Sequence, residues 1–123
     1  AFYIGLNIES YVPGMKGIGL VPPLAMPLDP LNQSWRDYGA RVGVWRMIEL
    51  LDELDMPASV LLNTDVCRNY PQIIEAGRAR NWSWLGHGVT NSRLWTDMEV
   101  GEEAALLDGI VADHIAGLTL AET

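Results

Sequence analysis

Cysteine, histidine and basic residues are scarce in this sequence. Its 123 residues include one cysteine, Cys67, and two histidines. A single cysteine excludes an internal disulfide and a metal site built from several thiolates. Eight lysines and arginines stand against sixteen acidic residues, so the formal net charge is −8. Because a surface of this charge repels phosphate groups, we expect no binding to nucleic acid or to a membrane surface.

A long apolar run and a secretion signal are also missing from the sequence. No apolar segment approaches the roughly 20 residues needed to cross a bilayer. The opening residues, AFYIGLNIES, have neither a basic flank nor a small-residue cleavage pattern. We therefore expect a cytoplasmic protein, in agreement with the single cysteine. The length predicts one domain over residues 1–123.

The first 36 residues predict a strand followed by a long loop. Residues 2–8, FYIGLNI, have the β-branched and aromatic content of a buried strand. Proline and glycine crowd residues 11–36, which disfavours both helices and strands there. The apolar residues in this segment favour an ordered loop packed over the end of the strand, and a floppy insertion is the alternative.

A helix is predicted next, over residues 37–56. Val44, Ile48 and Leu51 recur at helical spacing, and Pro57 ends the element. Gly39 and Gly43 weaken this helix, so they suggest a point of close packing.

The second half of the chain continues the alternation of strands and helices. ASVLL, residues 58–62, and WSWLG, residues 82–86, predict two further strands, with a short helical turn and a helix opening at Pro71 between them. A last helix is expected to be capped by Thr96 and Glu99 and to end at Gly117. Its apolar stripe comprises Val100, Ala104, Leu107, Val111 and Ile115.

The order β-α-β-α-β-α predicts an α/β fold with parallel strands and right-handed crossovers. In such folds the loops that follow the strands gather at one end, where the chemistry takes place. Glu9 and His87 both fall at that end, and a carboxylate and an imidazole in one cleft can divide proton transfer between them. The alternative is that His87 only shapes its turn through a hydrogen bond.

Two long motifs resemble a known family. The segment WRDYGARVGVWRMIELLDELDMPASVLLNTDVCRNYPQIIEAG at residues 35–77, together with GHGVTNS at residues 86–92, resembles the polysaccharide deacetylase family and most closely its allantoinase-like branch. The resemblance implies a deformed (β/α) barrel. It also implies hydrolysis of C–N bonds other than peptide bonds, such as those of N-acetyl sugars or cyclic amides.

The same resemblance implies roles for individual residues. Glu9 falls at the position of the catalytic base, and His87 falls at the first metal-binding histidine. Ser10 and Asn91 stand where a metal-binding aspartate and a second histidine would be expected. A hydroxyl and a carboxamide are poor zinc ligands, so we expect no metal and no other cofactor.

Without a metal, Glu9 would activate water and the other polar groups would stabilise the developing oxyanion. His87, Asn7 and Asn91 are candidates for this role and for binding an amide, a ureide or an N-acetyl sugar. Trp35 and Trp95 are expected near the end of the sheet where these loops gather, and their rings could stack on a sugar or heterocycle.

The sequence provides about three βα units, which is the N-terminal half of the family barrel. A closed barrel of eight units needs about 250 residues. We therefore expect either a piece of a longer protein or a half-domain that completes itself by homo-oligomerisation, and we favour the second. The predicted function is a metal-independent C–N hydrolase. The alternative is a catalytically silent module that binds a ligand or serves in assembly.

Overall fold

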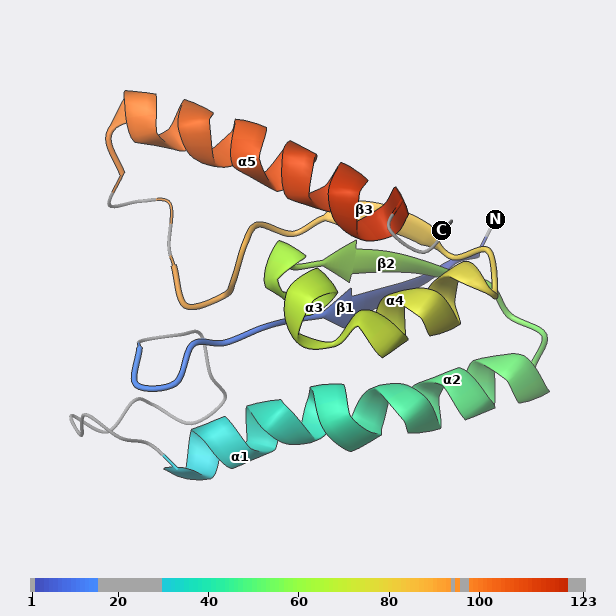
Figure 1. Cartoon of the computed structure of the whole chain (residues 1–123). Helices are drawn as coiled ribbons and strands as arrows, with labels where there is room; N and C mark the ends of the chain where they lie inside the picture. The colour runs from blue at the N-terminus through green and yellow to red at the C-terminus, as the bar shows by residue number, and fades with distance from the viewer. Residues whose placement is uncertain (1, 16–29, 94, 96–97, 120–123) are drawn as a thin grey trace.

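The computed structural model describes residues 2–15, 30–93, 95 and 98–119, and its centre is a three-stranded parallel sheet (Figure 1). The strands are β1 (Ile4–Ile8), β2 (Ala58–Leu62) and β3 (Ser83–Gly86), in the spatial order β1-β2-β3. Strand β2 pairs in parallel with β1 and with β3, in a register that places Val60 opposite Leu6 and Trp84. The predicted α/β class with parallel strands is confirmed.

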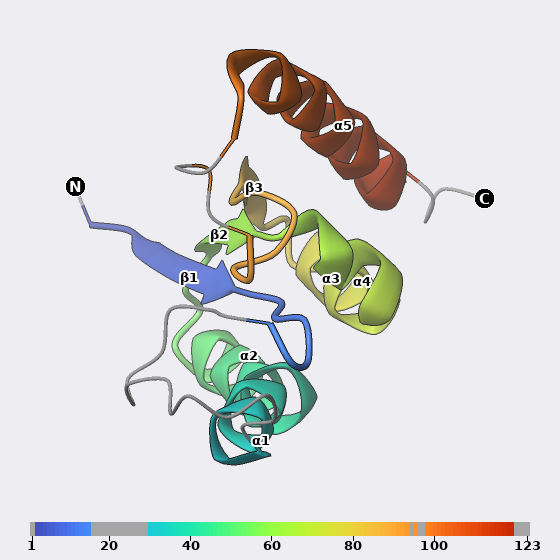
Figure 2. The ribbon, with the colours of Figure 1, turned by 90° about the vertical axis from the view of Figure 1, so that its left-hand side faces the viewer.

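Helices make both crossovers and extend beyond the sheet. They are α1 (Pro30–Tyr38), the π-helical turn η1 (Gly39–Gly43), α2 (Val44–Glu53), α3 (Thr64–Asn69), α4 (Pro71–Arg78) and α5 (Val100–Thr119). The first three form one continuous rod between β1 and β2, and α3 with α4 connects β2 to β3. Figure 2 shows the sheet between this rod and α5, with α3 and α4 beside it.

The core lies between the central strand and the helices. Along β2, Ala58, Val60 and Leu62 are buried, and they alternate with partly exposed residues. The predicted helical stripe of Val44, Ile48 and Leu51 is buried against this face. The other sheet face carries exposed residues at Gly5, Asn7 and Leu85. Because side chains alternate along a strand, this second face is the one toward which β1 and β3 direct residues 9 and 87.

The long loop ends earlier than predicted. We expected a loop over residues 11–36, but α1 begins at Pro30, so residues 30–36 are helical. Proline suits the first helical position, where its missing N–H would have no partner within the helix. Residues 16–29, with most of the apolar residues that favoured a packed loop, lie outside the described part of the chain.

The glycines of the first helical rod have a different role from the predicted one. A Cβ at Gly39 would meet nothing within 4 Å, and at Gly43 the nearest atom, the Tyr38 carbonyl oxygen, would be 3.7 Å away. The suggestion of close packing is therefore wrong. Instead, Gly39 to Gly43 form a π-helical turn that interrupts the regular helix.

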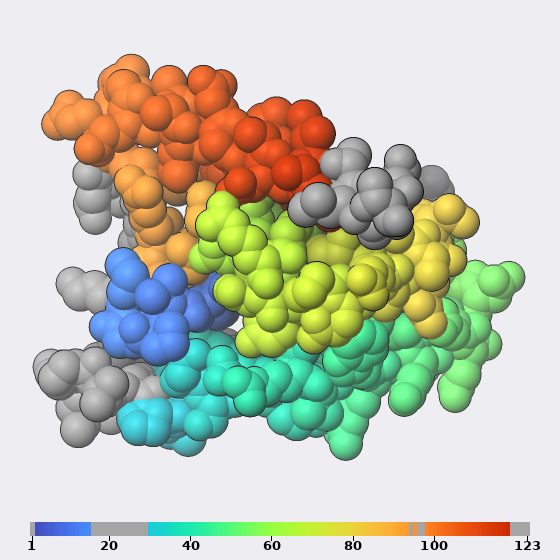
Figure 3. Space-filling model, viewed as in Figure 1, coloured from blue at the N-terminus to red at the C-terminus, as the bar shows by residue number. Residues whose placement is uncertain are grey.

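The last helix also corrects the prediction. Its stripe is exposed, with Val100 82% and Ile115 61% accessible, whereas Ile110 is buried. Leu107, Val111 and Ile115 of this stripe line a hollow together with Gly86 at the end of β3 and are not packed into a core. Helix α5 contacts α3 toward its C-terminal end, where Asp113 pairs with Arg68 and Gly117 approaches Cys67, while its first turn projects from the body of the molecule (Figure 3).

Both ends of α5 differ from the prediction. The helix begins at Val100, so Glu99 occupies the capping position, and its backbone N–H donates to Glu102 Oε2 at 3.5 Å. Thr96 lies outside the described residues. The helix continues past Gly117, where an added Cβ would lie 2.7 Å from Cys67 Sγ. Gly117 therefore permits close approach to α3 and does not stop the helix.

A transmembrane segment is not found in the described residues, since none of their helices is both long and apolar enough to cross a bilayer.

Candidate functional site

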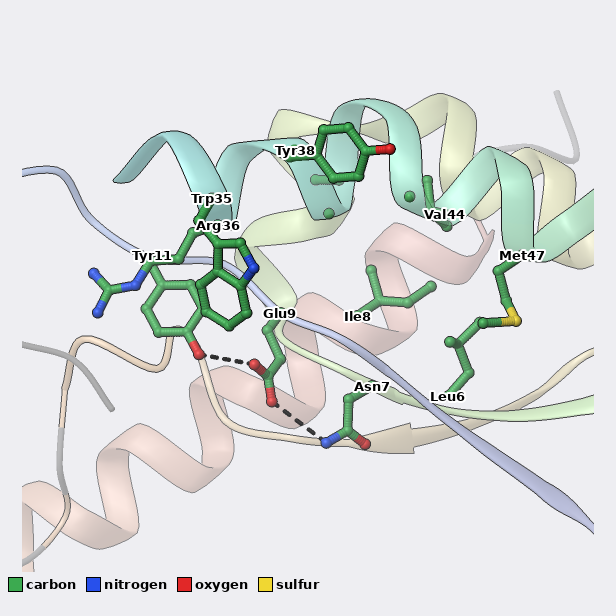
Figure 4. A pocket seen from close by; sticks show the side chains of 13 residues that line it. Leu6, Asn7, Ile8, Glu9, Tyr11, Trp35, Arg36, Tyr38, Val44 and Met47 are labelled. Carbon is green, nitrogen blue, oxygen red and sulfur yellow. Dashed lines mark hydrogen bonds between the residues drawn. The ribbon is translucent and has the colours of Figure 1, made fainter. Parts of the chain in front are cut away.

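Glu9, directly after β1, is the centre of a polar cluster. Its Oε1 lies 3.3 Å from His87 Nε2, and its Oε2 accepts a 2.8 Å hydrogen bond from the Tyr11 hydroxyl. Asn7 Nδ2 lies 3.4 Å from Oε1. Figure 4 shows the Glu9 carboxylate between Asn7 and Tyr11. The structure therefore brings together three of the residues predicted for the site, namely Glu9, His87 and Asn7.

Hydrogen bonds to backbone groups hold the two loops that carry Glu9 and His87. Asn63, fully buried after β2, accepts a 2.8 Å hydrogen bond from the Ser10 N–H and donates one to the His87 carbonyl. The Ser10 carbonyl accepts hydrogen bonds from the Thr90 hydroxyl at 2.8 Å and from the Asn91 N–H at 2.9 Å. The ends of all three strands are thus joined by hydrogen bonds directly beneath the site.

A hollow of about 350 Å³ lies on the Glu9 side, between β1 and the first helical rod. Its polar lining includes Glu9, Asn7, Tyr11 and Arg36. Trp35 forms part of its wall and is 52% exposed, so its ring is accessible to a ligand (Figure 4).

A second hollow, of about 600 Å³, lies on the His87 side, between the end of β3 and α5. Trp95, His114 and Ile110 line it together with His87. The two predicted stacking residues, Trp35 and Trp95, therefore line different hollows. The contact between Glu9 and His87 stands at the boundary between them.

Burial shifts the pKa of two groups near the site. It raises the pKa of Tyr11, and the neighbouring Glu9 carboxylate adds to the increase. Both effects favour the protonated hydroxyl that donates to Glu9. Burial lowers the pKa of His114, whose Nε2 is buried and without a hydrogen-bond partner among the described residues. His114 is therefore neutral at pH 7.

The side chains at the site do not fit a divalent metal ion. Ser10 is buried, and Asn91 Nδ2 lies 3.4 Å from the Tyr11 hydroxyl oxygen. His87 Nε2 faces Glu9. Within the part of the chain that the structure describes, no three histidine, cysteine or carboxylate side chains gather in one place. A stable zinc site takes three or four such ligands, so we derive no step through a metal.

Three contributors to the site were not predicted from the sequence. Tyr11 lies two residues after Glu9, and this spacing could have placed it on the same side of the chain. Asn63 directly follows β2, but nothing in the sequence indicated its hydrogen bonds to the two segments that follow β1 and β3. Arg36 was assigned to the long loop, and its stacking on Tyr11 depends on how α1 packs.

Comparison with known proteins identifies the fold. No protein-family model matches the chain, and no curated protein matches it by sequence. The structure is similar to the crystal structure of PuuE allantoinase, with a TM-score of 0.81 and 19% identity. The match covers 94% of this chain and 42% of that one, so this chain spans less than half the length of its neighbour. The likeness, together with the parallel sheet, confirms an α/β partial barrel.

Proposed function

We propose that this chain carries the base-bearing part of a hydrolase that cleaves C–N bonds other than peptide bonds. In this proposal it belongs to the polysaccharide deacetylase type and resembles the allantoinase-like branch. The observation that carries the proposal is the 3.3 Å approach of His87 Nε2 to Glu9 Oε1 at the carboxyl ends of parallel strands. The fold likeness to an allantoinase supports it.

The reaction begins with a water molecule bound between Glu9 and the substrate carbonyl carbon. Glu9 takes a proton from this water as the new C–O bond forms. The oxygen of the tetrahedral intermediate then accepts hydrogen bonds from His87 and from the Asn7 or Asn91 amide. As the C–N bond breaks, Glu9 returns the proton to the leaving nitrogen. Tyr11 holds the other carboxylate oxygen throughout, at 2.8 Å.

The proposed reaction is metal-independent. Serine and asparagine at positions 10 and 91 favour this version, because neither side chain is a good ligand for zinc. We therefore expect activity to survive treatment with a chelator.

A silent ligand-binding module is the second candidate. Both oxygens of Glu9 already have hydrogen-bonding neighbours, Tyr11 on one side and Asn7 with His87 on the other. Such a satisfied carboxylate can shape a binding site without activating water.

Hydrolysis of allantoin and of N-acetylglucosamine oligomers by the purified chain, with and without chelator, tests the first candidate. Glu9→Gln keeps the shape of the side chain but removes its basicity, so we expect a loss of about 10²- to 10⁴-fold in kcat. Glu75→Gln, the same change on the exposed surface of α4, should leave the rate unchanged. Full activity in Glu9→Gln contradicts the mechanism. Ligand binding without turnover in the unaltered chain identifies the silent module.

A further inference from the structure

Arg36 is a cation without a counter-ion in the described structure. Arg41, Arg68 and Arg80 each form an ion pair with an aspartate. The guanidinium of Arg36 instead stacks over the Tyr11 ring, with Cζ 4.3 Å from the ring centroid. Its Nε is buried and has no hydrogen-bond partner, and no described carboxylate lies within 4.0 Å to pair with it. A half-buried cation of this kind is stabilised when an anion binds to it.

The position of Arg36 connects it to the candidate base. Arg36 lines the hollow of about 350 Å³ that contains Glu9, and it also lines a neighbouring polar hollow of about 370 Å³. The Tyr11 side chain lies between the guanidinium and the carboxylate. Arg36 stacks on one face of the Tyr11 ring, and the Tyr11 hydroxyl donates a hydrogen bond to Glu9. One tyrosine side chain therefore separates the cation from the base.

The other charges around the polar hollow are already balanced. Asp37 accepts a 2.9 Å hydrogen bond from Gln33 and lies 4.0 Å from Arg41. Glu9 is contacted by Tyr11 and His87. Arg36 is consequently the one charged group lining this polar hollow that lacks a polar partner among the described residues.

We propose that Arg36 binds a carboxylate group of the ligand and thereby places the ligand's amide or ureide carbon at Glu9. The planar guanidinium can donate two parallel hydrogen bonds to a carboxylate, and stacking on Tyr11 holds it in one orientation. The ligand class is then an acylamino or ureido acid, not a neutral N-acetyl sugar. The inference rests on the proposed function for the role of Glu9, but the carboxylate site can be measured without it.

The test is a binding measurement with two probes of nearly the same size, N-carbamoylglycine, which carries a carboxylate, and N-carbamoylglycinamide, in which a neutral amide replaces it. Calorimetry on the unaltered chain should show the carboxylate binding about 10- to 100-fold more tightly, as expected for hydrogen bonds to a charged group. Arg36→Gln should abolish this preference. Arg36→Lys, which keeps the charge but loses the planar pair of donors, should retain part of it. Arg46→Gln, a matched change at an exposed arginine of the same helical rod that lines neither hollow, should leave it unchanged.

Equal affinity of the two probes, binding of neither, or a preference that persists in Arg36→Gln would overturn the proposal. A far-ultraviolet circular dichroism spectrum of each variant checks that it is folded. If Arg36→Gln does not fold, the result with Arg36→Lys decides the question. Glu9→Gln should lose hydrolysis but keep the preference for the carboxylate probe, because Arg36 is unchanged in this variant. If the unaltered chain prefers the carboxylate probe but hydrolyses nothing, the anion site stands and the hydrolase proposal fails. If it hydrolyses substrates without that preference, the hydrolase proposal stands and the anion site fails.

Discussion

At the scale of single residues, Asn63 holds the candidate site together. It is fully buried, and its amide satisfies the Ser10 N–H and the His87 carbonyl. Asn63→Ala leaves two backbone groups without partners, so we expect the free energy of unfolding to fall by about 2–4 kcal/mol. Urea denaturation followed by circular dichroism measures this change.

The control for Asn63 is Asn69→Ala, at the exposed end of α3. It removes the same amide from a position without a buried bond and should change stability by less than about 0.5 kcal/mol. Equal losses in the two variants would show that the hydrogen bonds of Asn63 contribute little.

The sequence predicted part of the residue-scale picture. Glu9 and His87 follow two parallel strands, so the chain order alone placed both at one end of the sheet. Their 3.3 Å contact also requires both side chains to leave their strands on the same face of the sheet, and no sequence pattern predicted that face. The stacking of Arg36 on Tyr11 joins α1 to the loop after β1. No local pattern encodes such an approach of distant segments.

At the scale of elements, α4 depends on a glycine to pack against β3. A Cβ at Gly77 would lie 2.6 Å from ring atoms of both Trp82 and Trp84. These rigid rings are tilted against each other with centroids 6.1 Å apart, and Trp82 is buried. Gly77→Ala should therefore lower the free energy of unfolding by about 1–3 kcal/mol, as overpacking does elsewhere.

Gly109→Ala is the matched control for this prediction. An added Cβ there meets nothing within 4 Å, and the position is inside α5. Alanine favours the helix over glycine by up to about 1 kcal/mol, so this variant should unfold at equal or higher urea concentration. If Gly77→Ala behaved in the same way, α4 would have room to move away from the tryptophans.

Helical periodicity predicted α2 correctly and misjudged α5 for one physical reason. A stripe such as Val44, Ile48 and Leu51 shows that one face of a helix is apolar, and β2 is present to cover it. The stripe that includes Leu107 and Val111 is equally regular but remains exposed. Periodicity reports which face is apolar but not what covers it.

At the scale of the whole molecule, the sheet is open at both edges. The order β1-β2-β3 leaves one side of β1 and one side of β3 unpaired among the described strands. Beside β3, the exposed stripe of α5 and the hollow of about 600 Å³ form an apolar surface. Soluble proteins rarely leave an unpaired strand and a large apolar surface side by side.

We propose that a second copy of this chain covers the apolar surface beside β3. The unpaired edge of β3 lies beside this surface, so one contact between two copies could cover both. Light scattering after gel filtration should then give a mass near twice 13.6 kDa. The net charge of −8 on each copy opposes association, so added salt should strengthen it.

Substitution of the stripe tests which surface is used. Val111→Lys places a charge in the exposed apolar stripe and should shift the population toward single chains, because burying that charge in an interface is unfavourable. Ala105→Lys adds the same charge at an exposed position of α5 outside the stripe and should leave the mass unchanged. A single species of 13.6 kDa at every protein and salt concentration would exclude self-association. An assembly indifferent to Val111→Lys would place the contact on another surface, with the free edge of β1 as the remaining sheet edge.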